Sequence, residues 1–120
     1  MYISIKKINI MENYIKICPV ENIKDFKGQK FYLDDLDIEV AVFRINDKFY
    51  VVDNVCPHQH RSILCDGFIE NKSVICPAHG WEFNLETGKR PDGGKGINSY
   101  EIKIENGYIY AKIIKKSFNW

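Results

Sequence analysis

The chain has 120 residues, of which 45% are hydrophobic, so it has room for one compact domain and not for a second catalytic unit. Lysine and arginine number 17 against 16 aspartates and glutamates, and the net charge of +1 gives no broad basic field that would attract nucleic acid or anionic lipid. We therefore expect neither nucleic acid nor a membrane among the partners, and recognition of any partner through a local patch.

The two ends of the chain are the least informative parts. Residues 1–13 are interpreted as an N-terminal extension or an added edge strand. Lys6 and Lys7 interrupt the apolar residues there, so the segment lacks the continuous apolar stretch of a signal peptide or a spanning helix. This pattern predicts a soluble, cytoplasmic protein. Residues 114–120 form a tail whose terminal tryptophan either docks on the body or frays.

Between these ends, short runs rich in valine, isoleucine, tyrosine and phenylalanine alternate with clusters of glycine, asparagine and aspartate. No segment holds a 3.6-residue apolar period for three turns, so the sequence predicts an all-β fold. A single helical turn is expected at Pro19–Ile23. The expected strands, in chain order, are Tyr14–Cys18, Lys30–Leu33, Ile38–Ile45, Phe49–Asp53, Phe68–Glu70, Val74–Cys76, Glu82–Leu85, Tyr100–Ile104 and Tyr108–Ile113.

Turn-forming residues predict that neighbouring strands pair in antiparallel fashion. Asn46-Asp47 and Asn71-Lys72 each join two expected strands, and Glu105-Asn106-Gly107 supplies the positive φ of a tight hairpin. The stretch Pro91–Gly96 holds three glycines in six residues, which predicts a surface loop.

Two Cys/His half-sites carry the most chemical information. Cys56-Pro-His58 is followed, after 17 residues, by Cys76-Pro-Ala-His79. Two thiolates and two imidazoles suit either tetrahedral zinc or an iron–sulfur cluster, so the ligand types alone leave both open. The four cysteines would by number also permit two disulfides, but metal-ligand spacing in a chain with no export signal favours metal binding.

The residues around the half-sites favour the larger inorganic group. A proline after each cysteine stiffens both loops and suggests that they face each other. Gly67 and Gly80 would let the backbone approach something bulky, to which amide groups could donate hydrogen bonds. A single zinc ion needs less of this.

The combination of Cys-Pro-His with Cys-Pro-x-His-Gly-Trp resembles a Rieske domain, in particular that of the small Rieske ferredoxins. The likeness covers residues 14–113 and includes the segments Val42–Asp53 and Trp81–Gly88. It implies a Rieske-like antiparallel β-sandwich with a small cluster-binding subdomain formed by two loops. It also implies one Rieske-type [2Fe–2S] cluster, in which Cys56 and Cys76 bind the inner iron and the histidines the outer one.

The same resemblance implies an electron-transfer component rather than an enzyme. Such a ferredoxin takes an electron from a flavin reductase and passes it to a terminal oxygenase. An alternative is the small subunit of a larger reductase, such as a nitrite reductase. The chain has three histidines, and His60 alone remains after His58 and His79 are assigned to the cluster, so a second iron site of the oxygenase type is not expected. The identity of the donor and acceptor, the final substrate and the oligomeric state stay open.

Several further residues have ordinary interpretations. Cys18 and Cys65 are expected to be small buried hydrophobes, and His60, which replaces a glycine frequent in the family, an exposed histidine. Trp81 and Phe83 alternate with a charged residue at strand period, which predicts core packing or shielding of the cluster. The acids Asp53, Asp66, Glu70 and Glu82 are interpreted as mostly solvated charges that are also candidates for docking a basic partner.

The resemblance also implies a redox potential toward the lower part of the Rieske span of roughly −150 to +300 mV. High-potential members carry a disulfide beside the cluster, and Arg61 and Ala78 stand at those positions here. They also carry serine and tyrosine hydroxyls that donate to the cluster sulfurs, and Trp81 and Phe83 stand there instead. Fewer donors mean weaker stabilisation of the reduced form.

Overall fold

The computed structural model describes residues 14–34, 36–56, 61–78 and 80–113. Its regular structure there consists of strands and two short 3-10 helices, which confirms the predicted all-β fold, and no helix in these segments is long and apolar enough to cross a membrane. The strands are β1 Tyr14–Pro19, β2 Lys27–Leu33, β3 Ile38–Ile45, β4 Lys48–Asp53, β5 Val55–Cys56, β6 Arg61–Ser62, β7 Phe68–Glu70, β8 Ser73–Ile75, β9 Glu82–Asn84, β10 Ser99–Glu105 and β11 Tyr108–Lys112, and the 3-10 helices are η1 Val20–Asn22 and η2 Leu64–Asp66.

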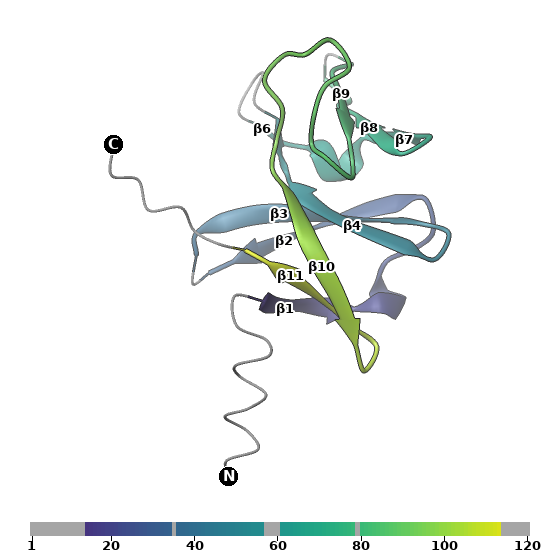
Figure 1. Ribbon diagram of the computed structural model, residues 1–120, viewed down its shortest axis with the longest axis vertical. Coiled ribbons are helices and arrows are strands. Elements are labelled where there is room, and N and C mark those ends of the chain that lie inside the picture. The colour runs from purple at the N-terminus through teal and green to yellow at the C-terminus, as the bar shows by residue number, and fades with distance from the viewer. Residues whose placement is uncertain (1–13, 35, 57–60, 79, 114–120) are drawn as a thin grey trace.

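Six strands form one antiparallel sheet in the order β1-β11-β10-β4-β3-β2 (Figure 1). Strand β10 joins the two halves of this sheet, because Ser99 and Tyr100 pair with β4 whereas Glu101–Glu105 pair with β11. Apolar residues of β3 and β4 pack against those of β1 and β11 in one buried cluster. The sheet is therefore folded over on itself, and this is the predicted sandwich.

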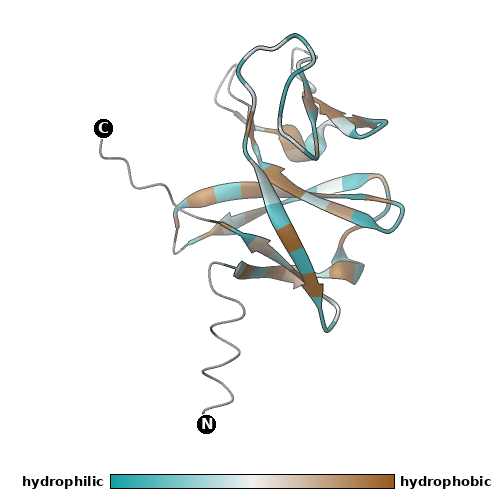
Figure 2. Ribbon diagram, viewed as in Figure 1, coloured by the Kyte–Doolittle hydropathy of each residue, from teal (hydrophilic) through white to brown (hydrophobic). Residues whose placement is uncertain are grey.

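Strand β3 lies at the centre of the molecule and is buried on both faces. Val40 and Val42 belong to the core between the two halves of the sheet, whereas Ala41 and Phe43 belong to a second core. All four side chains have no exposed surface. Side chains on a strand alternate between faces, so one continuous apolar run serves two cores. Figure 2 shows the hydrophobic residues gathered in the strands of the main sheet and at its junction with the smaller sheets.

The second core joins the main sheet to a smaller unit made of the β5–β6 pair, η2 and the sheet β7-β8-β9 (Figure 1). Gly28 of β2 permits this contact, since a Cβ there would lie 2.4 Å from Phe43 Cε1 and 2.7 Å from the Cys65 carbonyl oxygen. Strand β2 accordingly begins at Lys27, before the predicted start at Lys30. The sequence prediction missed this start because glycine and lysine are poor strand formers, and the close packing against η2 decides the matter.

The predicted hairpin turns are confirmed. Asn46 and Asn71 have positive φ values of 59° and 57°, and the β10–β11 turn has 53° at Asn106 and 79° at Gly107. The predicted loop over residues 91–96 contains no strand or helix. The short strands β5 and β6 were not predicted, because a strand of two residues leaves no periodic pattern of apolar residues in the sequence.

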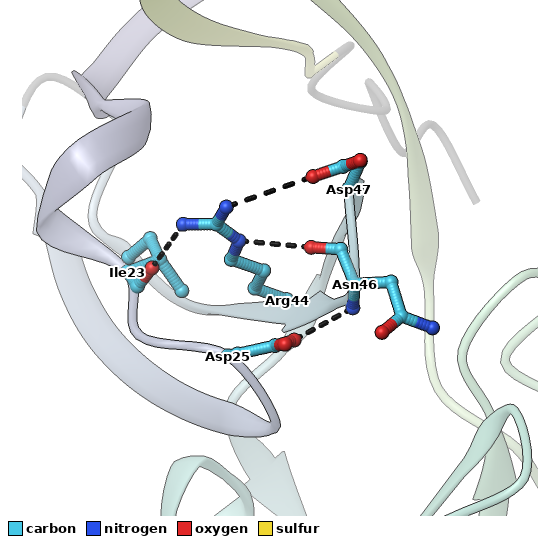
Figure 3. A network of polar contacts seen from close by, with 5 residues as sticks. All are labelled: Ile23, Asp25, Arg44, Asn46 and Asp47. Atoms are coloured by element: carbon cyan, nitrogen blue, oxygen red, sulfur yellow. Dashed lines mark hydrogen bonds and ion pairs between the residues drawn. The ribbon is translucent and has the colours of Figure 1, made fainter.

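A polar network anchors the β3–β4 hairpin to the segment that precedes β2 (Figure 3). Arg44 donates from Nε to the Asn46 carbonyl at 2.9 Å and from Nη1 to the Ile23 carbonyl at 3.1 Å. The Asn46 amide donates to Asp25 Oδ1 at 2.6 Å. These bonds fix the turn of the β3–β4 hairpin against the segment before β2.

Candidate metal centre

Two of the four predicted ligands, Cys56 and Cys76, come together in the smaller unit. Cys56 ends β5 and Cys76 directly follows β8, and each side chain is only 2% exposed. Both belong to the same apolar cluster, the one that joins the smaller unit to the main sheet. His58 and His79 lie outside the described residues, so their assignment as ligands of the outer iron remains a prediction.

The second ligand loop is closed at its base by two backbone hydrogen bonds. The Cys76 amide donates to the Trp81 carbonyl at 2.7 Å, and the Gly80 amide donates to the Cys76 carbonyl at 2.9 Å. Gly80 has a φ of +78°, and a Cβ built there would meet nothing within 4 Å. Gly80 is therefore required by the turn itself, and Pro77 and Ala78 project into solvent from a loop whose cysteine is buried.

The first ligand loop depends on a residue that the sequence analysis did not single out. Asn54 lies between β4 and β5 and is completely buried. Its Oδ1 accepts from the Cys65 amide at 2.6 Å, its carbonyl accepts from the Leu64 amide at 3.1 Å, and its amide donates to the Glu39 carbonyl at 3.2 Å. Asn54 thus ties the start of this loop to both η2 and the main sheet.

The Asn54 side chain also has an unusual feature. Its Nδ2 is buried and has no hydrogen-bond partner of ordinary geometry among the described residues. The nearby Cys65 thiol is half-buried, and its pKa is raised, chiefly by burial and then by the neighbouring Asp66, although Lys30 and the Asn54 side chain act in the opposite direction. A buried asparagine between two strands has no distinctive sequence signal, which explains why it was missed.

The structure gives Gly67 a reason within the protein. A Cβ at Gly67 would lie 2.6 Å from both the Ile75 carbonyl oxygen and Val74 Cγ2. The glycine therefore allows the chain after η2 to pass close to β8. This contact within the protein accounts for the residue without any inorganic group.

The structure confirms the predictions for Phe83, Trp81 and Cys18 and differs from the prediction for Asp53. Phe83 is fully buried, Trp81 packs against the same core, and their ring centroids are 6.5 Å apart, so the predicted packing role is confirmed. Cys18 is buried as expected, at 4% exposure. Asp53 is not a free solvated charge, because it accepts hydrogen bonds from the Tyr100 hydroxyl at 2.6 Å and from the Asn98 amide at 2.9 Å. Burial and this contact with Asp53 raise the pKa of Tyr100.

The sequence profile of the Rieske [2Fe-2S] domain matches residues 13–95. The chain belongs to the Rieske [2Fe–2S] domain family. It is 31% identical over 103 residues to the ferredoxin component of an alkene monooxygenase system from Xanthobacter autotrophicus, covering 80% of this chain and 78% of that protein.

Solved structures show the same fold. The ferredoxin of Sphingomonas yanoikuyae B1 is similar, with a TM-score of 0.74 and 27% identity over 83% of this chain and 98% of that one. An NADH-dependent nitrite reductase small subunit from Mycobacterium tuberculosis has a TM-score of 0.77 at 21% identity, covering 84% and 95% of the two chains, and this likeness shows the fold alone. The protein is a Rieske ferredoxin, an electron-transfer component that works with redox partner proteins.

The described residues fit the cofactor of the family, one Rieske [2Fe–2S] cluster. Two thiols stand in one apolar cluster at 2% exposure, and the second loop is closed so that Pro77, Ala78 and Gly80 stand outside the core. When bound, the cluster supplies reversible one-electron chemistry. The chain's own residues hold the thiols in the core, close the loop and exclude water with Phe83 and Trp81.

Proposed function

We propose that this Rieske ferredoxin carries single electrons from a flavin reductase to a terminal oxygenase in the cytoplasm. The ligands we propose are Cys56, Cys76, His58 and His79, with the cysteines on the inner iron and the histidines on the outer one. Two thiolates and two neutral imidazoles leave the oxidised centre uncharged, so an added electron is less strongly repelled than in a four-cysteine centre.

The observation that best supports this function is the change from buried to exposed along the second loop. Cys76 is buried, yet its neighbours Pro77 and Ala78 are exposed, as is Gly80. A cofactor held at Cys76 therefore lies one short loop away from solvent. Such a position suits transfer between proteins, because the partner needs to approach only one end of the molecule.

The surface around this loop has the character of a transient docking site. Residues 75–81 include no acidic residue, lysine or arginine. Phe68 is 66% exposed and pairs in register with Ile75, the residue that precedes Cys76. Exposed aromatic residues near the centre of a protein interface commonly contribute most of its binding energy. We therefore place the oxygenase contact on Phe68 and the second loop.

The test compares two exposed apolar residues at opposite ends of the molecule. Phe68→Ala should weaken binding of the reduced ferredoxin to a purified oxygenase about tenfold or more, because fully burying a phenylalanine contributes roughly 1.5–3 kcal/mol. Ile104→Ala is the matched control, since Ile104 is 47% exposed on β10, next to the β10–β11 hairpin that lies far from the smaller unit (Figure 1). Equal weakening by both variants would rule out docking at the loop.

Acidic residues near the proposed oxygenase contact provide a separate test. Asp66 and Glu70 are exposed on η2 and β7. Charge reversal at either position should change the association rate with the partner, in a manner that fades at high salt, and should leave the visible spectrum unchanged. Stopped-flow mixing at two ionic strengths measures this rate. A salt-independent rate in both variants would exclude electrostatic steering by these acids.

A further inference from the structure

Arg90 lies directly over the ring of Trp81. The guanidinium carbon is 3.6 Å from the ring centroid, close enough for a face-on cation–π contact. Arg90 also pairs with Asp92, Nη2 to Oδ2 at 2.7 Å. The Arg90 side chain is only 14% exposed, whereas that of Asp92 is 60% exposed. The positive end of this pair is therefore inside and the negative end is in solvent.

The loop around Arg90 is built to hold this arrangement. The two ends of the loop are held together at Gly88, whose carbonyl accepts a hydrogen bond from the Ile97 amide at 2.8 Å. The second oxygen of Asp92, Oδ1, accepts from the Gly94 amide at 2.8 Å. Proline at the next position restricts Arg90 to an extended backbone. A long flexible side chain is thus fixed through its own backbone, its partner and the ring below it.

Trp81 connects this cation to the metal centre. Its carbonyl closes the second ligand loop by accepting from the Cys76 amide at 2.7 Å. It also packs against the apolar cluster that contains Cys56 and Cys76. The Arg90 charge therefore lies one aromatic side chain away from the core that holds both thiols, in a region of reduced dielectric.

We propose that Arg90 is a positioning and tuning residue that raises the redox potential by holding a fixed positive charge on Trp81, beside the cluster. One-electron reduction adds one negative charge to the centre, and a nearby cation stabilises the reduced form more than the oxidised form. The carboxylate of Asp92 does not cancel this effect, because water screens the more exposed charge more strongly.

The inference rests on the proposed ligand set, and the two can be tested apart. The rhombic EPR signal of the reduced holoprotein reports the two-cysteine, two-histidine ligation, whereas the midpoint potential reports the surrounding charge. Neither measurement requires a redox partner. An intact EPR signal with an unchanged potential would therefore count against Arg90 without affecting the proposed function.

The experiment is protein-film voltammetry on three holoprotein variants at pH 7. Arg90→Gln should lower the equilibrium constant for reduction threefold to tenfold, which at 59 mV per tenfold change for one electron is about 30 to 60 mV. Arg90→Lys keeps the charge and should retain most of the potential. Lys89→Gln is the control, because Lys89 is the exposed neighbour of Arg90 and its replacement removes the same positive charge as Arg90→Gln does.

A fourth variant separates charge from loop structure. Asp92→Asn removes the negative end of the pair and leaves the cation, so the potential should stay the same or rise. A fall in Asp92→Asn as large as in Arg90→Gln would mean that loop order, not charge, sets the potential. An equal fall in Arg90→Lys, or in Lys89→Gln, would likewise overturn the proposal.

Discussion

The most demanding test of the site concerns Asn54, which holds the first ligand loop. Replacing it with alanine leaves the part-buried Cys65 amide without its acceptor at 2.6 Å, and such a loss costs about 1–3 kcal/mol. The same change removes the buried Nδ2, which has no partner of ordinary geometry among the described residues, so the net destabilisation is smaller than the loss of the acceptor alone. Both groups lie in one small site, so we expect a net destabilisation of about 1–2 kcal/mol.

The loss of stability in Asn54→Ala should open the cluster site locally before the whole protein unfolds. Asn54 connects η2 to the start of the first loop, so its removal favours local opening there. Since 1.4 kcal/mol is about a factor of ten, a loss of about 1–2 kcal/mol should make the visible absorbance of the holoprotein bleach roughly five to thirty times faster in moderate urea.

Asn84→Ala is the matched control for this experiment. Asn84 Oδ1 also accepts from backbone amides, at 2.8 Å from Glu86 and 3.0 Å from Thr87, but in an exposed turn where water can replace it. We expect little change in the bleaching rate. If Asn54→Ala bleaches no faster than Asn84→Ala, the idea that the buried amide holds the ligand loop is wrong.

Four further predictions follow from the same geometry. Gly80→Ala should lower the free energy of unfolding by roughly 1–2 kcal/mol, because residue 80 has a φ of +78°, and the urea midpoint should fall accordingly. Gly80→Asn should restore part of this stability. Burial raises the pKa of the Cys18 thiol from 9.0 to about 11. The stability that the neutral, buried thiol contributes is therefore complete below pH 9 and is lost as pH rises toward 11. The melting temperature of Cys18→Ala should accordingly fall less between pH 8 and 10.5 than that of the wild type. Cys65→Ser and His60→Ala should each keep the rhombic EPR signal, and its loss in a folded variant would contradict the ligand assignment. The midpoint potential of the unaltered protein should lie below about +150 mV by voltammetry between pH 6 and 9.

Local sequence signals were sufficient for the longer strands, apart from the start of β2, and for the ligand spacing. Strands such as β3 and β11 have strong apolar patterns, and asparagine at the hairpins provides the positive φ that each turn requires. The Cys-Pro-His and Cys-Pro-x-His spacing is likewise a property of neighbouring residues. These features could be predicted because each depends on residues a few positions apart.

Contacts between distant segments decided the remainder. Gly28 and Gly67 are explained by the packing of η2 against β2 and of the following chain against β8. Asp53 is tied to Tyr100, although 47 residues separate them in the chain.

The same holds for the two residues around which the new tests are designed. Asn54 becomes a clamp only when η2 folds against it, and Arg90 meets Trp81 only when the loop closes at Gly88. A sequence specifies which side chains are available at each position. Their partners, burial and dielectric surroundings arise when the chain brings those positions together, and these determine what buried polar groups and charges do.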